Sequence, residues 1–161
     1  MVGTVMRWRG KPSKFMRVSM ATALLACMTL LIEHRHGLAT EDDGMLKIRV
    51  IVGSETLAAT LDDSPAARDF ASLLPLELSI SDYASTEKVA DLPRQLDVRD
   101  APASYAPKVG DITYYAPWGN LAIFYKPFQA SRGLVRLGAF DGPIRALLQA
   151  GVVSVRIEAM Q

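Results

Sequence analysis

The sequence predicts a mostly β fold, a small closed antiparallel β-barrel with two short helices. Several runs alternate between apolar and polar residues with a period of two, as half-buried strands do. Gly and Pro separate these runs, and only two short stretches have helical spacing. At least six short strands in a body of about 120 residues favour a closed barrel, because closure removes exposed strand edges.

The first half of this body predicts a hairpin, a helix and a third strand. Residues 45–52 and 56–61 alternate on either side of a Gly-Ser-Glu turn, so we expect them to pair. Ser64 can cap a helix over 65–74 that begins with a proline, where the missing N–H costs nothing. The third strand begins at Leu76 and ends at Asp82-Tyr83.

Residues 84–109 form a long passage with three prolines and charges of both signs. Connections of this length without regular structure often carry a binding surface, and a solvated flap is the alternative. Two strands follow at 112–116 and 121–125, joined by a Pro-Trp-Gly-Asn turn. After a second loop at 127–133, the remaining expectations are a strand over 134–140, a short helix that 141–143 opens and Gly151 ends, and a closing strand over 152–158.

The N-terminal segment 1–39 has the order of zones found in a secretory signal peptide. A basic region ends at Arg17, an apolar run covers 18–32, and small residues precede a cleavage site after Ala39. The mature domain would then be 40–161, periplasmic or secreted from a bacterium. A start at Met16 instead of Met1 would give a signal of ordinary length.

Two alternatives to cleavage stay open. The segment could remain as an inner-membrane anchor, although its apolar run of 15 residues is shorter than the roughly 20 that a spanning helix needs. Cys27, the only cysteine, follows a Leu-Leu-Ala sequence like that of a lipoprotein attachment site, so lipidation is the other alternative.

Charge argues against nucleic acid as a partner. Residues 1–39 carry six basic residues and one acidic, whereas 40–161 carry 12 basic and 16 acidic. A weakly acidic body lacks the clustered basic surface that phosphate binding needs.

The mature domain also lacks the side chains of common catalytic sites. Its segment contains neither cysteine nor histidine, since His34 and His36 lie before the cleavage site. We therefore expect no Ser-His-Asp triad, no metal site and no cofactor. Glu87, Asp91 or Asp111 could do acid–base work if burial shifted its pKa, but a turn role is favoured for Asp111.

The aromatic hairpin, formed by the predicted strands 112–116 and 121–125 and the turn between them, is the best candidate for contact with a ligand. Alternation puts Tyr114 on one face of its strand and Tyr115 on the other, so one face fills the barrel and the other can present aromatic rings outward. The predicted ligand-binding residues are Tyr114, Tyr115, Trp118, Asn120, Phe124 and Tyr125. The alternative interpretation is that these residues only fill the barrel core and form a turn beneath a surface flap.

The chain from residue 45 to 159 resembles a bacterial family of small cyclophilin-like proteins. The resemblance rests on Tyr83, the Thr-Glu-Lys and Leu-Pro-Arg sequences at 86–94, the run 110–125 and the strand 134–138. It implies a cyclophilin-type fold, an eight-stranded barrel with a helix near each open end, and no established reaction.

True cyclophilins isomerise the bond before proline with an arginine, and their Phe-His-Arg and Gln-Phe-Phe motifs are missing here. Arg94 and Arg132 are the weak candidates for that role. The leading hypothesis is an exported, non-catalytic module that binds a peptide or small molecule. A weak peptidyl-prolyl isomerase is the alternative hypothesis, and a structural role within an assembly of the cell envelope is the third. The sequence leaves the oligomeric state open.

Overall fold

The structure is a computed structural model that describes residues 45–160. The predicted signal peptide 1–39, the lipidation site at Cys27 and the alternative start at Met16 lie outside the described residues. Their outcomes therefore stay predictions.

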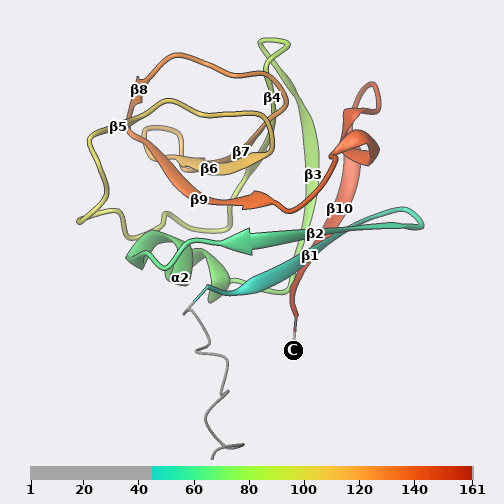
Figure 1. Ribbon diagram of the computed structural model, residues 1–161, viewed down its shortest axis with the longest axis horizontal. Helices are drawn as coiled ribbons and strands as arrows, with labels where there is room; N and C mark the ends of the chain where they lie inside the picture. Colours follow the sequence, from blue (N-terminus) through green and yellow to red (C-terminus); the bar gives the residue numbers. More distant parts are fainter. Residues whose placement is uncertain (1–44, 161) are drawn as a thin grey trace, which may run out of the picture. The chain divides into compact units, whose positions relative to one another are not determined.

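Eight antiparallel strands close into a barrel, which confirms the predicted fold class (Figure 1). Going round the barrel, the order is β1-β10-β3-β4-β7-β6-β9-β2. The strands are β1 (Lys47–Val52), β2 (Glu55–Leu61), β3 (Leu76–Tyr83), β4 (Glu87–Asp91), β6 (Asp111–Tyr115), β7 (Asn120–Phe124), β9 (Leu134–Phe140) and β10 (Val153–Ala159). The predicted hairpins, β1 with β2 and β6 with β7, both form.

One helix and one 3₁₀ turn contribute apolar residues to the barrel core. Helix α2 (Pro65–Ala71) begins as expected, with the Ala67 N–H donating to Ser64 Oγ at 3.2 Å. It ends three residues earlier than predicted, at Ala71, where the Ser72 hydroxyl bonds to the Asp69 carbonyl. The second predicted helix is the 3₁₀ turn η1 (Arg145–Leu148). Within residues 45–160, neither helical element has the length and apolarity needed to span a bilayer.

The interior is filled by the inward residues of the alternating strands together with Phe70 of α2 and Leu147 of η1. Strands β2 and β9 approach so closely that Gly138 has no room for a side chain. A Cβ built there would lie 2.2 Å from the Thr60 carbonyl oxygen and 2.8 Å from Leu61 Cα. Closure of the barrel at this seam therefore depends on a glycine.

Strand β4 (Glu87–Asp91) was not predicted, because 84–109 was expected to be irregular. Its inward positions hold Lys88 and Ala90, a charged and a small residue, so its alternation does not look like that of a half-buried strand. Lys88 is 1% exposed, and its ammonium donates to Asp82 Oδ2 at 2.9 Å and the Gln149 carbonyl at 2.7 Å. These contacts explain how a lysine can lie inside the barrel.

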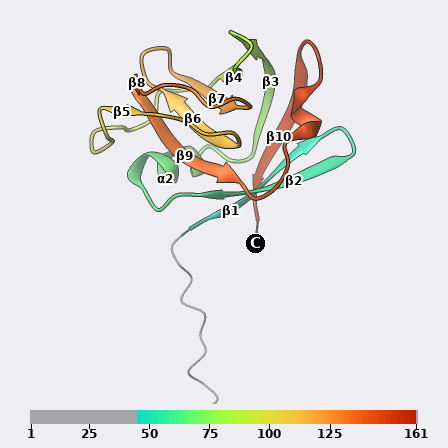
Figure 2. The same cartoon turned by 45° about the horizontal axis from the view of Figure 1, so that its top comes forward.

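A second, smaller layer lies on the outer face of the barrel. Strands β5 (Ser104–Tyr105) and β8 (Ser131–Arg132) pair as a separate two-stranded sheet (Figure 2). Tyr105 packs against a small apolar cluster of Ala122, Phe124 and Leu134, which project outward from β7 and β9. The outer face of the aromatic hairpin is thus partly covered, as the flap interpretation anticipated.

Candidate functional site

Strand register brings a set of outward side chains together on neighbouring strands. Glu87 of β4 is paired with Phe124 of β7, two residues along from the pair formed by Val89 and Ala122. On the other edge of β7, Asn120 is paired with Tyr115 of β6. Because successive strand residues point to opposite faces, all of these side chains share the outer face of the sheet.

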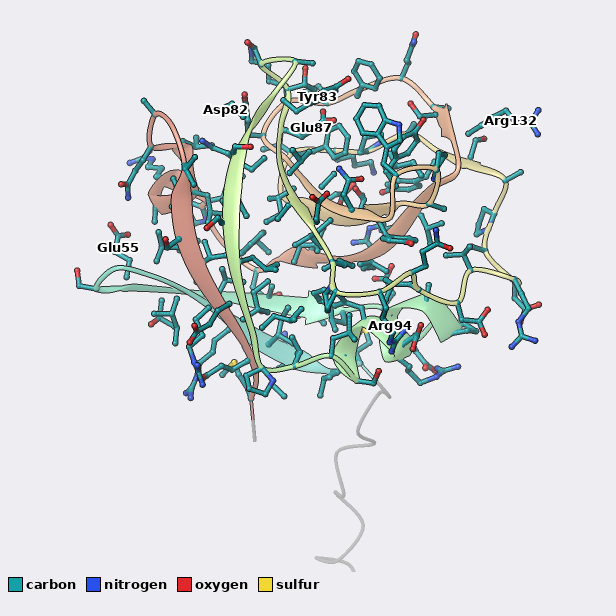
Figure 3. The ribbon with its side chains drawn as sticks, turned by 180° about the vertical axis from the view of Figure 1, so that it is seen from behind. Glu55, Asp82, Tyr83, Glu87, Arg94 and Arg132 are labelled. Carbon is teal, nitrogen blue, oxygen red and sulfur yellow. The ribbon has the colours of Figure 1, made fainter. Side chains whose placement is uncertain are left out.

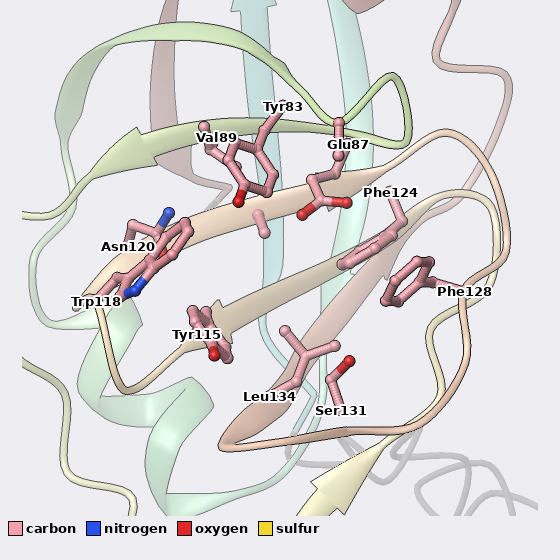
Figure 4. A pocket seen from close by; sticks show the side chains of 12 residues that line it. Tyr83, Glu87, Val89, Tyr115, Trp118, Asn120, Phe124, Phe128, Ser131 and Leu134 are labelled. Atoms are coloured by element: carbon pink, nitrogen blue, oxygen red, sulfur yellow. The ribbon is translucent and has the colours of Figure 1, made fainter.

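These outward residues line a pocket with a volume of about 220 Å³. Its floor and walls come from β4, β6, β7 and β9, the end of β3 with the turn after it, the β6–β7 turn, and the start of β8 with the loop before it (Figure 4). The lining residues are Tyr83, Ala84, Glu87, Val89, Tyr115, Trp118, Asn120, Ala122, Phe124, Phe128, Ser131 and Leu134.

Five aromatic rings surround the pocket in two groups. Trp118 meets both Tyr83 and Tyr115 edge to face, with ring centroids 5.3 Å apart in each pair and interplanar angles of 89° and 83°. Phe124 and Phe128 are stacked, with centroids 6.4 Å apart. Tyr83, Trp118 and Phe128 are also the only exposed aromatic residues among those that the structure describes. Exposed aromatic surface is therefore concentrated at this pocket.

The polar groups of the pocket are few. Figure 4 shows the Glu87 carboxyl group turned toward the pocket, and burial raises the pKa of this carboxyl above its ordinary value. Asn120 is 5% exposed, and its Oδ1 is the only buried side-chain oxygen or nitrogen of residues 45–160 without a hydrogen-bond partner. The described residues contain no group of three His, Cys, Asp or Glu side chains placed to hold a metal ion.

Four of the six predicted ligand-binding residues line the pocket: Tyr115, Trp118, Asn120 and Phe124. Tyr114 does not, because it points into the barrel core, where its hydroxyl accepts from the Leu96 N–H at 3.2 Å. Tyr125 also lies outside the lining, and its hydroxyl donates to Asp82 Oδ1 at 3.1 Å.

Sequence reasoning did not include Tyr83, Glu87 or Phe128 in the ligand-binding set. Tyr83 ends β3, Glu87 begins β4 within the passage that the sequence predicts to be irregular, and Phe128 lies in the loop after β7. A signal for the first two did exist, since both fall in or beside the passage 84–109 that was expected to carry a binding surface. Nothing in the local pattern around Phe128 marks it.

The two arginines proposed for isomerase chemistry lie elsewhere. Arg94 makes a two-point ion pair with Asp69, its Nη1 and Nη2 lying 2.8 and 2.7 Å from the two carboxylate oxygens. This pairing lowers the pKa of Asp69. Figure 3 shows Arg94 near α2, away from Tyr83 and Glu87, and Arg132 at the outer edge of the molecule. Neither arginine lines the pocket.

Asp111 has the structural role that the sequence favoured. It is 4% exposed and accepts from the Tyr105 hydroxyl at 2.7 Å, the Lys108 N–H at 2.7 Å and Arg136 Nε at 3.3 Å. Arg136 also pairs with Asp62. Burial and the bond to Asp111 together raise the pKa of Tyr105 to about 12. These hydrogen bonds hold the β5 segment against the outer face of the barrel.

Three comparisons with known proteins bear on this arrangement. A family model described as the cyclophilin-like family matches residues 50–158. The solution structure of a hypothetical protein from Archaeoglobus fulgidus is similar, with a TM-score of 0.54 and 17% identity, over 75% of this chain and 99% of that chain. At this identity the likeness concerns the fold alone. No curated protein matches the sequence.

Proposed function

The chain belongs to the cyclophilin-like family, and we propose that it is a non-catalytic binding module. The pocket on the outer face of the aromatic hairpin would hold a small molecule or one side chain of a peptide. The observation that carries the proposal is the gathering of five aromatic rings and one buried, unpartnered amide oxygen around a single hollow.

The size of the pocket supports a ring-sized occupant. Its volume is about 220 Å³, and a cavity of about 150 Å³ in another protein accepts benzene. One ring with one or two further heavy atoms would fit. Whole drug-sized ligands fill larger pockets of roughly 300 Å³ or more.

The exposed rings at the rim also support a binding role. Trp118, in the turn between β6 and β7, is 59% exposed. Aromatic side chains with a polar atom are frequent anchors of recognition surfaces, because they bury a large area with few rotatable bonds. A purely structural turn would not need three exposed rings around a hollow.

The isomerase alternative has less support. Cyclophilin-type catalysis needs an arginine that donates to the substrate backbone, and Arg94 already donates to the Asp69 carboxylate and the Ser72 hydroxyl. Arg132 is exposed and has no side-chain partner that would orient it among the described residues. We therefore propose binding without turnover.

We also propose that the protein is exported after cleavage of its N-terminal segment. The basic, apolar and small-residue zones of 1–39 support a cleaved signal peptide. N-terminal sequencing of the protein recovered from the cell envelope of a bacterial host tests this. A first residue at position 40 in the periplasmic or secreted fraction would support export, whereas an intact segment in the cytoplasm would refute it.

The binding role is tested by titrating the full chain with a panel of ring-sized neutral fragments, small amines and short proline-containing peptides. Trp118 and the other pocket residues should report saturable binding by nuclear magnetic resonance. A refolding assay limited by proline isomerisation should show no acceleration. Saturable binding lost in Trp118→Ala would support the proposal, and acceleration lost in Arg94→Ala or Arg132→Ala would favour the isomerase instead.

A further inference from the structure

We infer that the group bound in this pocket is an organic ammonium carrying N–H donors, held between the aromatic rings, the Glu87 carboxylate and the Asn120 amide oxygen. This inference rests on the proposed binding role and names the chemical class of its ligand. Three independent features of the pocket support it, namely its charge, its rings and its unpartnered acceptor.

The charge of the pocket is negative and unbalanced. Glu87 is the only charged side chain among the lining residues. Among residues 45–160, no lysine or arginine lies within ion-pair distance of its carboxylate, although ten other ion pairs form in the same part of the chain. A partly buried carboxylate without a partner is unfavourable, and burial accordingly raises its pKa. A cationic ligand would supply the missing partner.

The rings have the arrangement that favours a cation. Trp118 is nearly perpendicular to both Tyr83 and Tyr115, so the three rings form adjoining walls rather than a stack. The face of each ring carries partial negative charge, and cations bind over such faces, most strongly over tryptophan. Figure 4 shows these rings on one side of the hollow and the Glu87 carboxyl group across from Tyr115.

Asn120 adds a hydrogen-bond requirement to this charge requirement. Its Oδ1 is buried without a partner, whereas the other buried side-chain polar atoms of the described residues have one. Buried polar groups are almost always hydrogen-bonded, so a ligand N–H that reaches the Asn120 Oδ1 would give this acceptor a partner. A ligand that pairs with Glu87 and also donates to Asn120 needs both positive charge and N–H groups, which suits an ammonium better than a neutral ether or ketone.

Three probes that share a benzyl ring separate these contributions when they are titrated into the full chain at neutral pH. Benzylammonium has both charge and N–H donors, benzyl alcohol has a donor without charge, and benzyltrimethylammonium has charge without N–H. Nα-acetyl-lysine methylamide is the fourth probe, because a lysine side chain of a peptide shares the same chemistry. Its relative affinity tells a peptide source from a free amine.

We expect benzylammonium to bind about tenfold more tightly than benzyl alcohol, with benzyltrimethylammonium between them. Glu87→Gln should abolish most of that preference and leave the affinity for benzyl alcohol within about twofold, since the rings are unchanged. Glu55→Gln is the matched control, because Glu55 is an exposed strand glutamate on the distant β1–β2 hairpin (Figure 3).

Equal or tighter binding of benzyl alcohol would overturn the inference while leaving the binding module in place. An ammonium preference that persists in Glu87→Gln would also overturn it. If none of the four probes binds, the inference fails, and the proposed function fails with it only if the wider panel of neutral fragments and peptides also gives no saturable binding.

Discussion

Tyr83 and Trp118 meet edge to face across the rim of the pocket, with ring centroids 5.3 Å apart and planes at 89°. They are far apart in sequence and come from the end of β3 and the turn between β6 and β7. The neighbour order β3-β4-β7-β6 brings these segments together. The rim is therefore a product of barrel topology, and substitutions at the rim can be separated from substitutions that damage the barrel.

Trp118→Ala should weaken ligand binding with little loss of stability. The indole is an exposed wall of the pocket, so its removal should lower affinity about tenfold or more. Its two edge-to-face contacts limit the loss of unfolding free energy to about 1–2 kcal/mol. Calorimetric titration and urea denaturation measure the two effects.

Val109→Ala is the matched control, because Val109 has the same 59% exposure as Trp118 and does not line the pocket. It should leave affinity unchanged. Equal affinity losses in both variants would mean that the effect of Trp118→Ala is not specific to the pocket.

Glu87→Gln should raise the thermal stability of the unliganded protein at neutral pH. Burial raises the folded-state pKa of Glu87 above its unfolded value, so between these two pKa values the folded chain binds more protons than the unfolded chain. Stability therefore falls as the pH rises through this window, and the penalty is absent below it. Replacing the carboxyl with an amide removes this contribution.

Thermal denaturation from pH 4 to pH 8 measures the difference between wild type and Glu87→Gln, with Glu55→Gln as the control. The two melting curves should converge at acid pH and separate toward neutral pH, with the variant more stable. A variant that is less stable at neutral pH would show that Glu87 has a stabilising partner, and the binding argument would lose its charge component.

Gly138→Ala should prevent normal closure of the barrel. The added methyl would overlap the Thr60 carbonyl oxygen, and backbone on both sides of the β2–β9 seam leaves little room for adjustment. We expect a loss of about 3 kcal/mol or more, measured by urea denaturation. Gly142→Ala, where no atom lies within 4 Å of the added Cβ, should cost much less. A small effect at Gly138 would contradict the described seam.

Asp111→Ala should loosen the β5 segment and destabilise the protein. It removes the acceptor for the Tyr105 hydroxyl, the Lys108 N–H and one contact of Arg136, which together should cost about 2–3 kcal/mol. Hydrogen exchange at Lys108 and near β5 should also accelerate. Asp100→Ala, at an exposed loop position, is the control and should change neither. An unchanged exchange rate in Asp111→Ala would show that the segment is held by other contacts.

Much of the barrel could be predicted because its strands alternate cleanly. The pattern of β1, β2, β6, β7 and β10 places apolar residues inside at every second position, and a sheet with one filled face enforces that register. Strand β4 could not be predicted because Lys88 occupies an inward position, where it is stabilised by Asp82 on the neighbouring strand and by the Gln149 carbonyl, 61 residues away in sequence. No local pattern carries that information.

The residues of the candidate site likewise fall into those that the sequence predicts and those that it does not. Its centre could be predicted, because Tyr115, Trp118, Asn120 and Phe124 lie on one aromatic hairpin whose alternation gives the outward face. Glu87 and Phe128 could not be assigned to it, since only the β4–β7 pairing and the fold of the loop after β7 bring them there. Tyr114 belongs to the predicted set as an aromatic residue of the hairpin, but it faces inward, because Ile112 and Tyr114 share the core side of β6.

The central claim is that the outer-face pocket binds a ligand, and chemical-shift mapping with benzylammonium on the ¹⁵N-labelled full chain tests it most directly. The account predicts saturable shifts confined to the residues around Tyr83, Glu87, Trp118, Asn120 and Phe128, which in Trp118→Ala need a benzylammonium concentration about tenfold higher or more. Shifts that gather on another face, or that persist unchanged in Trp118→Ala, would contradict it.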